Sequence, residues 1–294
     1  MVLHICLVLA IALLVTGCND NSRSASQPLA SGVKTNFDAV TGLVESVSAD
    51  LKSAKIAHDE IPGYMQAMSM TLPVQDANEL RGIIPGDKIT FRMVVTSDDG
   101  WIDQVKRAGQ GALTNAAGIE SDQPIQFLQA GSIIPDIALT NQFGKEFNLR
   151  DFRGKALAFT FIFTRCPFPI YCPRLNNNFT EVQSQLAAIP AATNWHLLSI
   201  SFDPKNDTPN VLENYARRYK YNPEHWTFAV GPEDRIRRFG ASFGLNFMTK
   251  NGAIDHNVRT VVVDGSGKVL KIFPNNEWKP QEVVDVMKEA MRAK

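Results

Sequence analysis

The sequence lacks net charge, a long membrane-spanning apolar segment and a framework of cysteines. Its 294 residues include 30 Lys+Arg and 30 Asp+Glu, without a run of five like charges, and this balance argues against nucleic acid as a partner. The longest mostly apolar stretch, residues 2–15, is shorter than the roughly 20 residues that span a bilayer. Four cysteines are too few for a small scaffold held by several disulfides. With 44% hydrophobic residues, the chain is typical of a globular protein.

The N-terminal segment has the features of an export signal. Residues 2–15 have the length and hydrophobicity of a signal-peptide core. Residues 14–18, Leu-Val-Thr-Gly-Cys, resemble the cleavage box of bacterial lipoproteins. The resemblance implies that residues 1–18 are a lipoprotein signal peptide, that Cys18 carries the lipid, and that the protein lies on the extracytoplasmic (periplasmic) face of a bacterial membrane. An ordinary signal peptide with a chance cysteine is the alternative.

Removal of the signal leaves two thiols for the folded part of the chain. These are Cys166 and Cys172, since Cys6 is removed and Cys18 carries the lipid. An exported location permits disulfides. The pair is therefore expected to be either one structural bridge or a reactive site.

Two polar segments with little hydrophobic periodicity divide the chain. Residues 19–35, rich in Ser, Asn and Ala, predict a flexible tether, and residues 109–125 predict an interdomain linker. Between them, in residues 36–108, turn residues separate strand-like runs at 40–48, 53–58, 67–74, 88–95 and 101–105. Such spacing predicts a small all-β domain, an OB-like barrel.

The second part, residues 126–294, alternates strand and helix patterns. Apolar runs at 156–163, 195–202 and 258–263 alternate with helical patterns at 173–187, 209–219, 233–243 and 280–293. This alternation predicts an α/β domain with a covered sheet. Residues 37–108 contain seven Lys/Arg and eleven Asp/Glu, whereas residues 126–294 contain twenty-one and sixteen. We expect weak attraction between the two domains, with scatter on solvated surfaces as the alternative.

Methionines and one histidine form a candidate soft-metal site in the first domain. Met68 and Met70 are two residues apart, so in a strand both side chains leave the same face. His58 lies near the end of the preceding strand, and the Pro-Gly turn at 62–63 can fold it back beside them. Two thioethers with an imidazole favour Cu(I). Methionines that only fill the core are the alternative.

Four short motifs surround these residues. They are His-Asp-Glu-Ile-Pro at 58–62, Met-Ser-Met at 68–70, Pro-Gly-Asp at 85–87 and Trp-Ile at 101–102. Together they resemble the CusF family of periplasmic copper and silver carriers. The resemblance implies that His58, Met68 and Met70 bind the ion. Met65 stands where that family has a capping tryptophan, which makes Met65 a candidate third thioether.

The cysteine pair lies between a predicted strand and a predicted helix. Proline favours the first helical position, so a helix starting at Pro173 places Cys172 at the N-cap. There the helix dipole, with Arg165 and Arg174 nearby, predicts a lowered thiol pKa. His256 is expected to open the strand 257–263. Two thiolates and one imidazole would suit copper in either oxidation state, and a disulfide would exclude the metal.

Further motifs follow in order along the second part. They are Pro-Asp at 135–136, Leu-Arg-Asp-Phe-Arg-Gly-Lys at 149–155, Thr-Arg-Cys-Pro at 164–167, Ser-Phe-Asp-Pro at 201–204 with Asp-Thr-Pro at 207–209, and Asp-His at 255–256 with Val-Asp at 263–264. They resemble the Sco/SenC family of cytochrome c oxidase assembly. The resemblance implies a thioredoxin-like fold, copper bound by Cys166, Cys172 and His256, and Asp203 near the site. The family usually has three residues between its cysteines, whereas this chain has five, so the loop must fold back to bring the sulfurs together.

These motifs predict an exported, lipid-anchored copper metallochaperone. It would deliver Cu(I) or Cu(II) to a cytochrome c oxidase subunit or another periplasmic copper protein, with transfer from the methionine site to the thiol site across the linker. One alternative is a thiol-disulfide oxidoreductase, in which Cys166 and Cys172 are the catalytic pair and a thiol reductant restores them. A second alternative is a copper-tolerance buffer without a respiratory client.

Overall fold

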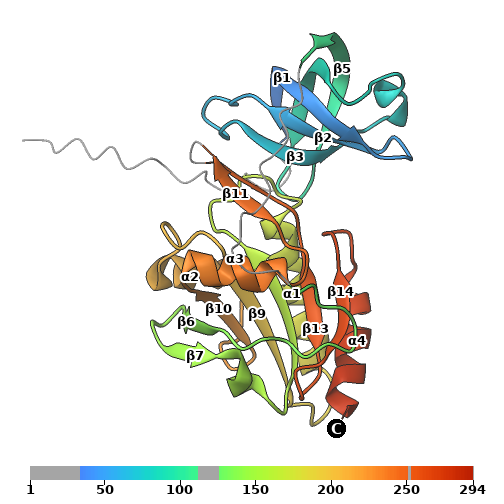
Figure 1. Cartoon of the computed structure of the whole chain (residues 1–294). Coiled ribbons are helices and arrows are strands. Elements are labelled where there is room, and N and C mark those ends of the chain that lie inside the picture. The colour runs from blue at the N-terminus through green and yellow to red at the C-terminus, as the bar shows by residue number, and fades with distance from the viewer. Residues whose placement is uncertain (1–33, 112–125, 251–252, 294) are drawn as a thin grey trace, which may run out of the picture.

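A computed structural model describes residues 34–111, 126–250 and 253–293. The predicted signal peptide with Cys18, most of the tether 19–35 and residues 112–125 of the linker lie outside the described residues. The first domain is an all-β unit, and it lies above an α/β domain in Figure 1. In the part of the chain that the structure describes, no helix is long and apolar enough to cross a membrane.

The first domain is one antiparallel sheet with the order β3-β2-β1-β4-β5. Its strands are β1 (Thr35–Val47), β2 (Ser53–His58), β3 (Met68–Pro73), β4 (Asp87–Val95) and β5 (Gly100–Gln110). Alternate residues such as Val44, Ile56 and Phe91 are buried, as expected for strands with one face on a core. The five predicted strands are confirmed. β5 continues to Gln110, so the first residues of the predicted linker belong to a strand.

The all-β character of the predicted OB-like barrel is confirmed, but the described residues do not close the sheet into a barrel. β3 ends at Pro73, which has no N–H for a further ladder bond, and the 3₁₀ helix η1 (Ala77–Leu80) follows. The Glu79 carboxylate accepts a hydrogen bond from the N–H of Val105 on β5 at 2.8 Å. The Glu79 side chain therefore accepts the hydrogen bond that the backbone carbonyl of a neighbouring strand would otherwise accept from Val105. In the described residues, one bridge, Val74 with Ile102, joins the two sides of the gap.

The second domain has a seven-stranded mixed sheet with the order β14-β13-β8-β9-β10-β6-β7. Its strands are β6 (Ala138–Asn141), β7 (Glu146–Asn148), β8 (Ala156–Ile162), β9 (Trp195–Ser201), β10 (Trp226–Val230), β13 (Thr260–Val263) and β14 (Val269–Phe273). β8, β9 and β10 run parallel, and every residue in them is buried. Burial on both faces is typical of parallel strands covered by helices.

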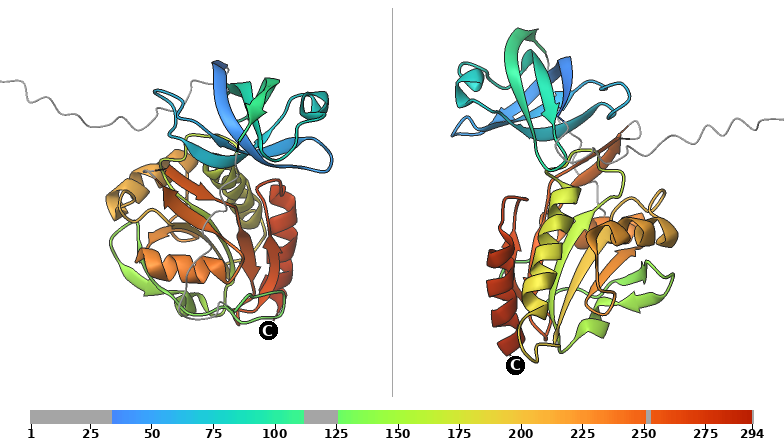
Figure 2. Two further views of the ribbon diagram at one scale, coloured as in Figure 1. Left: turned by 45° about the horizontal axis from the view of Figure 1, so that its top comes forward. Right: turned by 180° about the vertical axis from the view of Figure 1, so that it is seen from behind.

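Helices cover both faces of this sheet (Figures 1 and 2). They are α1 (Cys172–Ala187), α2 (Pro209–Ala216), α3 (Glu233–Ala241) and α4 (Pro280–Arg292), with the 3₁₀ segments η2 (Leu149–Phe152) and η3 (Arg217–Tyr219). α1 and α4 pack together on one face, and Phe239 of α3 packs on Phe159 from the other, with ring centroids 5.5 Å apart. The predicted α/β architecture is confirmed.

The loop between the two cysteines joins the domains. Phe168 and Ile170 of this loop are buried in the core of the β domain. The Phe168 ring lies against Gly100, where a Cβ atom would stand 2.6 Å from its Cζ. Tyr64 donates a hydrogen bond to the Pro167 carbonyl at 3.0 Å. The second domain thus contributes apolar side chains to the core of the first.

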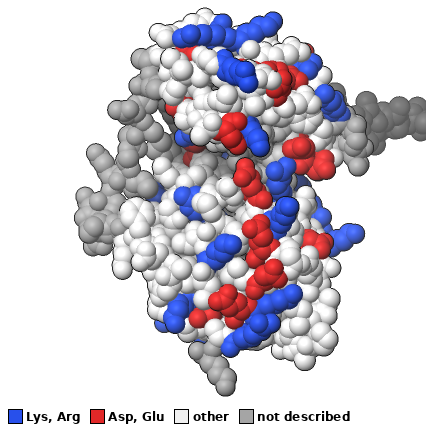
Figure 3. Space-filling view, turned by 90° about the vertical axis from the view of Figure 1, so that its right-hand side faces the viewer, with Lys and Arg blue, Asp and Glu red and all other residues white. Residues whose placement is uncertain are grey.

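Among the residues that the structure describes, two ion pairs cross the junction. Arg174 pairs with Asp99 at 3.1 Å, with the basic partner on the second domain as the charge balance predicts. Lys55 pairs with Asp255 at 3.6 Å with the opposite polarity. Figure 3 shows acidic and basic side chains interspersed along one side of both domains. Docking therefore depends on local pairs and apolar burial more than on the net charge of each domain.

Candidate metal centre

Strand register places the predicted ligands of the first domain together. In the β2–β3 ladder His58 pairs with Met68, and Ile56 pairs with Met70. Directly paired residues have Cβ atoms about 5 Å apart on one face. His58 and Met70 are buried, and Met68 is half-buried. The three side chains therefore share one face of two adjacent strands.

The His58 ring has one nitrogen free for a metal. Its Nδ1–H donates to the Asp59 carbonyl at 2.7 Å. Nε2 is buried and has no hydrogen-bond partner among the described residues. Burial lowers the pKa of His58, and the bond to Asp59 offsets part of that shift. A neutral imidazole with an unpaired, buried nitrogen fits the soft-metal site that the residue types predict, since such a nitrogen is otherwise costly.

Met65 joins the other two methionines. It lies in the short turn after β2, where it bridges to Ile61, and it is buried. Met65, Met68 and Met70 all line one cavity. The structure thus places the candidate third thioether beside the other two. No tryptophan is among the described residues that line this cavity.

The five-residue loop folds back and brings the two cysteines together. α1 begins at Cys172 with Tyr171 as its N-cap, one residue earlier than predicted. Both cysteines are free thiols; Cys172 is buried and Cys166 half-buried. The Cys172 thiol is near enough to Cys166 Sγ to lower the pKa of the Cys166 thiol. The long spacing therefore does not separate the sulfurs.

The lowered thiol pKa belongs to Cys166, so the prediction for Cys172 is wrong. Burial raises the pKa of Cys172, and its bond to the Cys166 thiol raises it further. Burial also acts to raise the pKa of Cys166, but hydrogen bonds from the thiol and backbone of Cys172 and from the backbone of Phe168 outweigh it and lower that pKa. The two arginines act elsewhere: Arg165 pairs with Asp203 at 2.8 Å and Arg174 with Asp99.

His256 reaches the site on a hairpin that the sequence did not predict. It ends β12 (Ala253–His256), which pairs with β11 (Phe247–Lys250), and β13 begins only at Thr260. The prediction that His256 opens the strand 257–263 is therefore wrong. Asn257 closes the hairpin, because its Oδ1 accepts from the Asn246 N–H at 2.8 Å.

Aromatic rings surround the His256 imidazole. The ring centroids of Phe202, Phe163 and Tyr171 lie 5.0, 5.5 and 6.1 Å away. Burial lowers the pKa of His256 to about 4, although its hydrogen bond with the Asn257 carbonyl acts in the opposite direction. The ring is therefore neutral at pH 7, and its Nδ1 bond at 2.9 Å leaves Nε2 for a metal.

The structure unites the second predicted ligand set only pairwise. Cys166 and Cys172 shift each other's pKa, and Cys166 and His256 line the same cavity. Among the described residues, no group of three His, Cys, Asp or Glu side chains is close enough to hold a metal ion. The set Cys166, Cys172 and His256 therefore remains a prediction.

Two carboxylates lie beside the cysteine loop, and they differ in role. Asp203 binds Arg165 and accepts from Asn206 Nδ2 at 2.8 Å, so it orients the loop residue before Cys166. Asp207 was given no role by sequence reasoning. It is fully buried, accepts from the Thr164 N–H at 3.0 Å, and burial raises its pKa. Its only signal was the Asp-Thr-Pro that precedes a helix.

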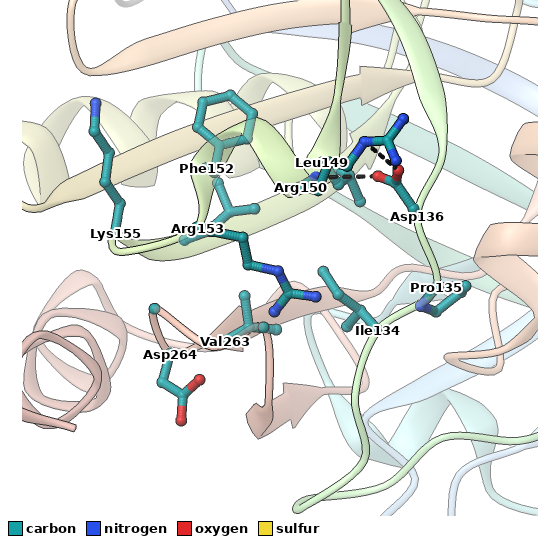
Figure 4. Close-up of a pocket in the computed structure, with 13 residues that line it drawn as sticks. Ile134, Pro135, Asp136, Leu149, Arg150, Phe152, Arg153, Lys155, Val263 and Asp264 are labelled. Carbon is teal, nitrogen blue, oxygen red and sulfur yellow. Dashed lines mark hydrogen bonds and ion pairs between the residues drawn. The ribbon is translucent and has the colours of Figure 1, made fainter. Parts of the chain in front are cut away.

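Several motif residues of the second part lie far from these ligands. Asp136, Arg150, Arg153, Lys155 and Asp264 line a cavity of about 20 Å³ before the start of β8 (Figure 4). Arg150 binds Asp136 through its side chain at 3.1 Å and its N–H at 3.0 Å. Cys166 follows the other end of the same strand, so these motifs stabilise the fold at the end of the sheet opposite the candidate metal centre.

Comparison with known families agrees with this geometry. A family model described as SCO1/SenC matches residues 127–292, more than half of the chain. The chain belongs to the SCO1/SenC family. A second model, described as copper binding periplasmic protein CusF, matches residues 38–107. Both resemblances are confirmed, and since both are copper-binding families, copper as the predicted metal is supported as well.

Individual relatives show how far the likeness of this SCO1/SenC protein extends. The SCO1 protein homolog of Bacillus subtilis is 29% identical over 159 residues, 52% of this chain and 80% of the relative. A SCO2-like protein of Rickettsia felis is 30% identical over 165 residues, 52% of this chain and 74% of the relative. The alignment with the solved structure of a SCO1/SenC family lipoprotein from Bacillus anthracis covers 54% of this chain and 95% of that chain, with a TM-score of 0.50 and 24% identity. This likeness supports the Sco-type thioredoxin-like fold.

Proposed function

We propose that this protein is a copper metallochaperone with two binding sites, which serves the assembly of the copper centre of cytochrome c oxidase. Copper is its cargo. His58, Met68 and Met70 hold one ion, and Cys166, Cys172 and His256 hold another. The protein works outside the cytoplasm, attached to the membrane through lipid on Cys18.

One observation carries this proposal: Met68 and Met70 of the first domain and Cys166 and His256 of the second line one cavity at the domain junction. Sulfur and imidazole ligands select Cu(I) over harder divalent ions. In both histidines Nδ1–H donates a hydrogen bond to the backbone carbonyl of the next residue. This bond fixes the tautomer, so that Nε2 carries the lone pair that can bind a metal. A protein that used only its thiols would gain nothing from the unpaired nitrogen of His58.

The asymmetry of the two thiols favours a second candidate function, thiol-disulfide exchange. The half-buried Cys166, with its lowered pKa, would attack a client disulfide as a thiolate, and the buried Cys172 would then displace the client. The client leaves as a dithiol, and the Cys166–Cys172 disulfide must be reduced by an external thiol. Because that disulfide removes both thiolates, copper loading and exchange exclude each other.

Anaerobic Cu(I) titration against a chromophoric chelator tests the proposal. We expect the wild-type chain to bind about two equivalents, and we expect Met68→Leu/Met70→Leu and Cys166→Ser/Cys172→Ser each to bind about one. Leucine replaces methionine at nearly equal volume, so the fold is retained. Met291→Leu, a partly buried methionine of α4, is the matched control and should bind two. A wild-type chain that binds no Cu(I), but rapidly reduces a client disulfide, would establish the exchange function instead.

A further inference from the structure

A small cavity lies between the domains, and donor atoms of both domains line it. Its volume is about 10 Å³, room for one water-sized particle. Met65, Met68 and Met70 line it from the first domain, and Cys166 and His256 line it from the second. The rest of its wall consists of Ser69, Phe163, Pro167, Phe168 and Tyr171. A space for a single ion is therefore enclosed by soft ligands in an otherwise largely apolar wall.

We propose that this cavity is a transfer site, in which one Cu(I) ion is held at the same time by Met68 and Met70 of one domain and by Cys166 and His256 of the other. The inference rests on the proposed chaperone function and deepens it. It assigns a copper position that neither domain contains alone. His58 and Cys172, which do not line the cavity, hold the ion before and after transfer.

The donor atoms are free to bind with little loss of native contacts. His256 hydrogen-bonds through Nδ1, which leaves Nε2 for the metal. The Cys166 sulfur makes a long contact of 3.8 Å to the Phe168 carbonyl and weak interactions with the thiol and backbone of Cys172. Thioether sulfurs are weak acceptors that lose little when they bind a metal. Binding of an ion therefore replaces weak contacts with metal bonds.

The cysteine loop holds the two walls of the cavity together. Phe168 is only 1% exposed although it belongs to the second domain, because its ring enters the core of the first. Tyr171 of the same loop donates to the Thr71 carbonyl on β3, next to Met70. These contacts place Cys166, two residues before Phe168, opposite the methionines of β3. The two extra residues of the loop thus have a role in joining the half-sites.

Residues of the cavity wall also line two larger clefts. Met70 and His256 also line an open cleft of about 410 Å³. Cys166 also lines a larger cleft of about 810 Å³, which Arg165 and Arg218 border. The first cleft offers an ion a path to Met70 and His256, and the second offers a client a path to Cys166.

Transfer through the cavity is ligand exchange without a change of oxidation state. The Cu–Nε2 bond of His58 would break as bonds to Cys166 Sγ and His256 Nε2 form, and the Cys166 thiol proton would leave to solvent. The bonds to Met68 and Met70 then break as Cys172 Sγ binds and releases its proton. Copper remains Cu(I) throughout, so no oxidant or reductant is needed.

A double-mutant cycle on the full chain tests the transfer site. Cu(I) affinity for the first equivalent is measured by chelator competition for wild type, Met68→Leu/Met70→Leu, Cys166→Ser and the combined variant. If the two domains share the ion, each change lowers this affinity at least tenfold, and the combined loss is smaller than the product of the separate losses. If the two domains bind copper independently, each set of substitutions lowers the affinity of one equivalent only, and the two losses multiply in the combined variant. That result would overturn the transfer site.

Separation of the domains gives a second test. Phe168→Ala should lower the affinity for the first equivalent at least tenfold while total capacity stays at two, and Phe143→Ala, an exposed phenylalanine at 57%, should change neither. Gly100→Val displaces the Phe168 ring from the first domain and should reproduce the effect if Phe168→Ala fails to fold. Unchanged affinity in both folded variants would refute the shared site but leave the chaperone function intact. A wild-type chain without Cu(I) binding would refute the function itself.

X-ray absorption of the selenomethionine-labelled chain gives a direct readout. With one equivalent of Cu(I), the shared site predicts Cu–Se scattering together with short Cu–S scattering from the thiolate. Phe168→Ala should remove one of the two signals. Wild-type scattering from only one donor type, or mixed scattering that Phe168→Ala leaves unchanged, would contradict the proposal.

Discussion

The two half-sites differ in what holds them in place. His58 and Met68 are direct partners in the β2–β3 ladder, so the backbone register of one small domain fixes their geometry. Cys166 and His256 lie on a loop and a hairpin, and the loop places Phe168 in the core of the other domain. The first half-site is therefore complete within its own domain, whereas the second depends on docking. Variants of the junction can break or sharpen this difference.

The largest effect is expected from loss of the Phe168 side chain. Truncation of a fully buried phenylalanine costs about 3–5 kcal/mol, and here the cost falls on the contact between domains. In urea, Phe168→Ala should unfold in two separate transitions at lower midpoints, whereas the wild-type chain should unfold in transitions that lie closer together. Far-UV and near-UV circular dichroism would follow both domains.

Phe143→Ala is the control for that experiment. Its ring is exposed and lies in the second domain away from the loop. The free energy of unfolding should therefore change by no more than about 0.5 kcal/mol. A Phe168→Ala variant that unfolded like wild type would show that the loop does not couple the domains.

Sequence reasoning located the elements of the sheets well, because their patterns are local. β2, from Ser53 to His58, was predicted with its observed bounds, and the motif in β3 gave the Met68 and Met70 pair. Closure of the first sheet could not be predicted, since it depends on how Glu79 meets Val105, 26 residues away. The burial of Phe168 in the other domain is likewise a tertiary contact without a local signal.

The candidate site shows the same division between local and distant information. The ligand types and their order were readable, but the pKa of each thiol depends on burial that only the folded loop determines. Dipole and arginine arguments favoured Cys172, and the structure gives the lowered pKa to Cys166 because Cys172 is enclosed and donates to it. His256 was assigned to the wrong strand because the short β11–β12 hairpin has weak periodicity.

The next effect is the pH dependence of stability that His256 confers on the metal-free protein. Its pKa is lowered to about 4 in the folded state, against about 6.5 in an unfolded chain. The unfolded chain therefore binds more protons between these values, and stability falls as pH falls from about 6.5 to 4. His256→Gln should reduce this loss by up to about 3 kcal/mol, measured by urea denaturation at each pH.

His225→Gln supplies the comparison for His256. It removes a half-buried histidine that stacks on Trp195 far from the cavity. Any general effect of exchanging a half-buried histidine for glutamine will appear in this variant as well, so the difference between the two variants isolates the contribution of His256. Equal slopes in wild type and His256→Gln would mean that the second half-site is open to water even when the domains are docked.

A smaller effect separates the two thiols. Since the pKa of Cys166 is lowered and that of Cys172 raised, alkylation by iodoacetamide at pH 7 should modify Cys166 at least about tenfold faster. Cys172→Ser should slow alkylation of Cys166 if the serine hydroxyl is a weaker partner for the thiolate than the thiol. Mass spectrometry of the peptides gives both rates, and comparable rates for the two cysteines in the native wild-type chain would contradict the assignment.

The smallest effect is expected from the ion pair between Arg174 and Asp99, which are half-buried and exposed, respectively. Pairs of this kind contribute less than about 1 kcal/mol and weaken with salt. Arg174→Gln should therefore shift the unfolding midpoint slightly at low ionic strength and not at all in 1 M NaCl, while Phe168→Ala keeps its effect in both. If the salt-sensitive pair proved the stronger contact, charge would govern docking, and the half-site on the cysteine loop would open and close with ionic strength.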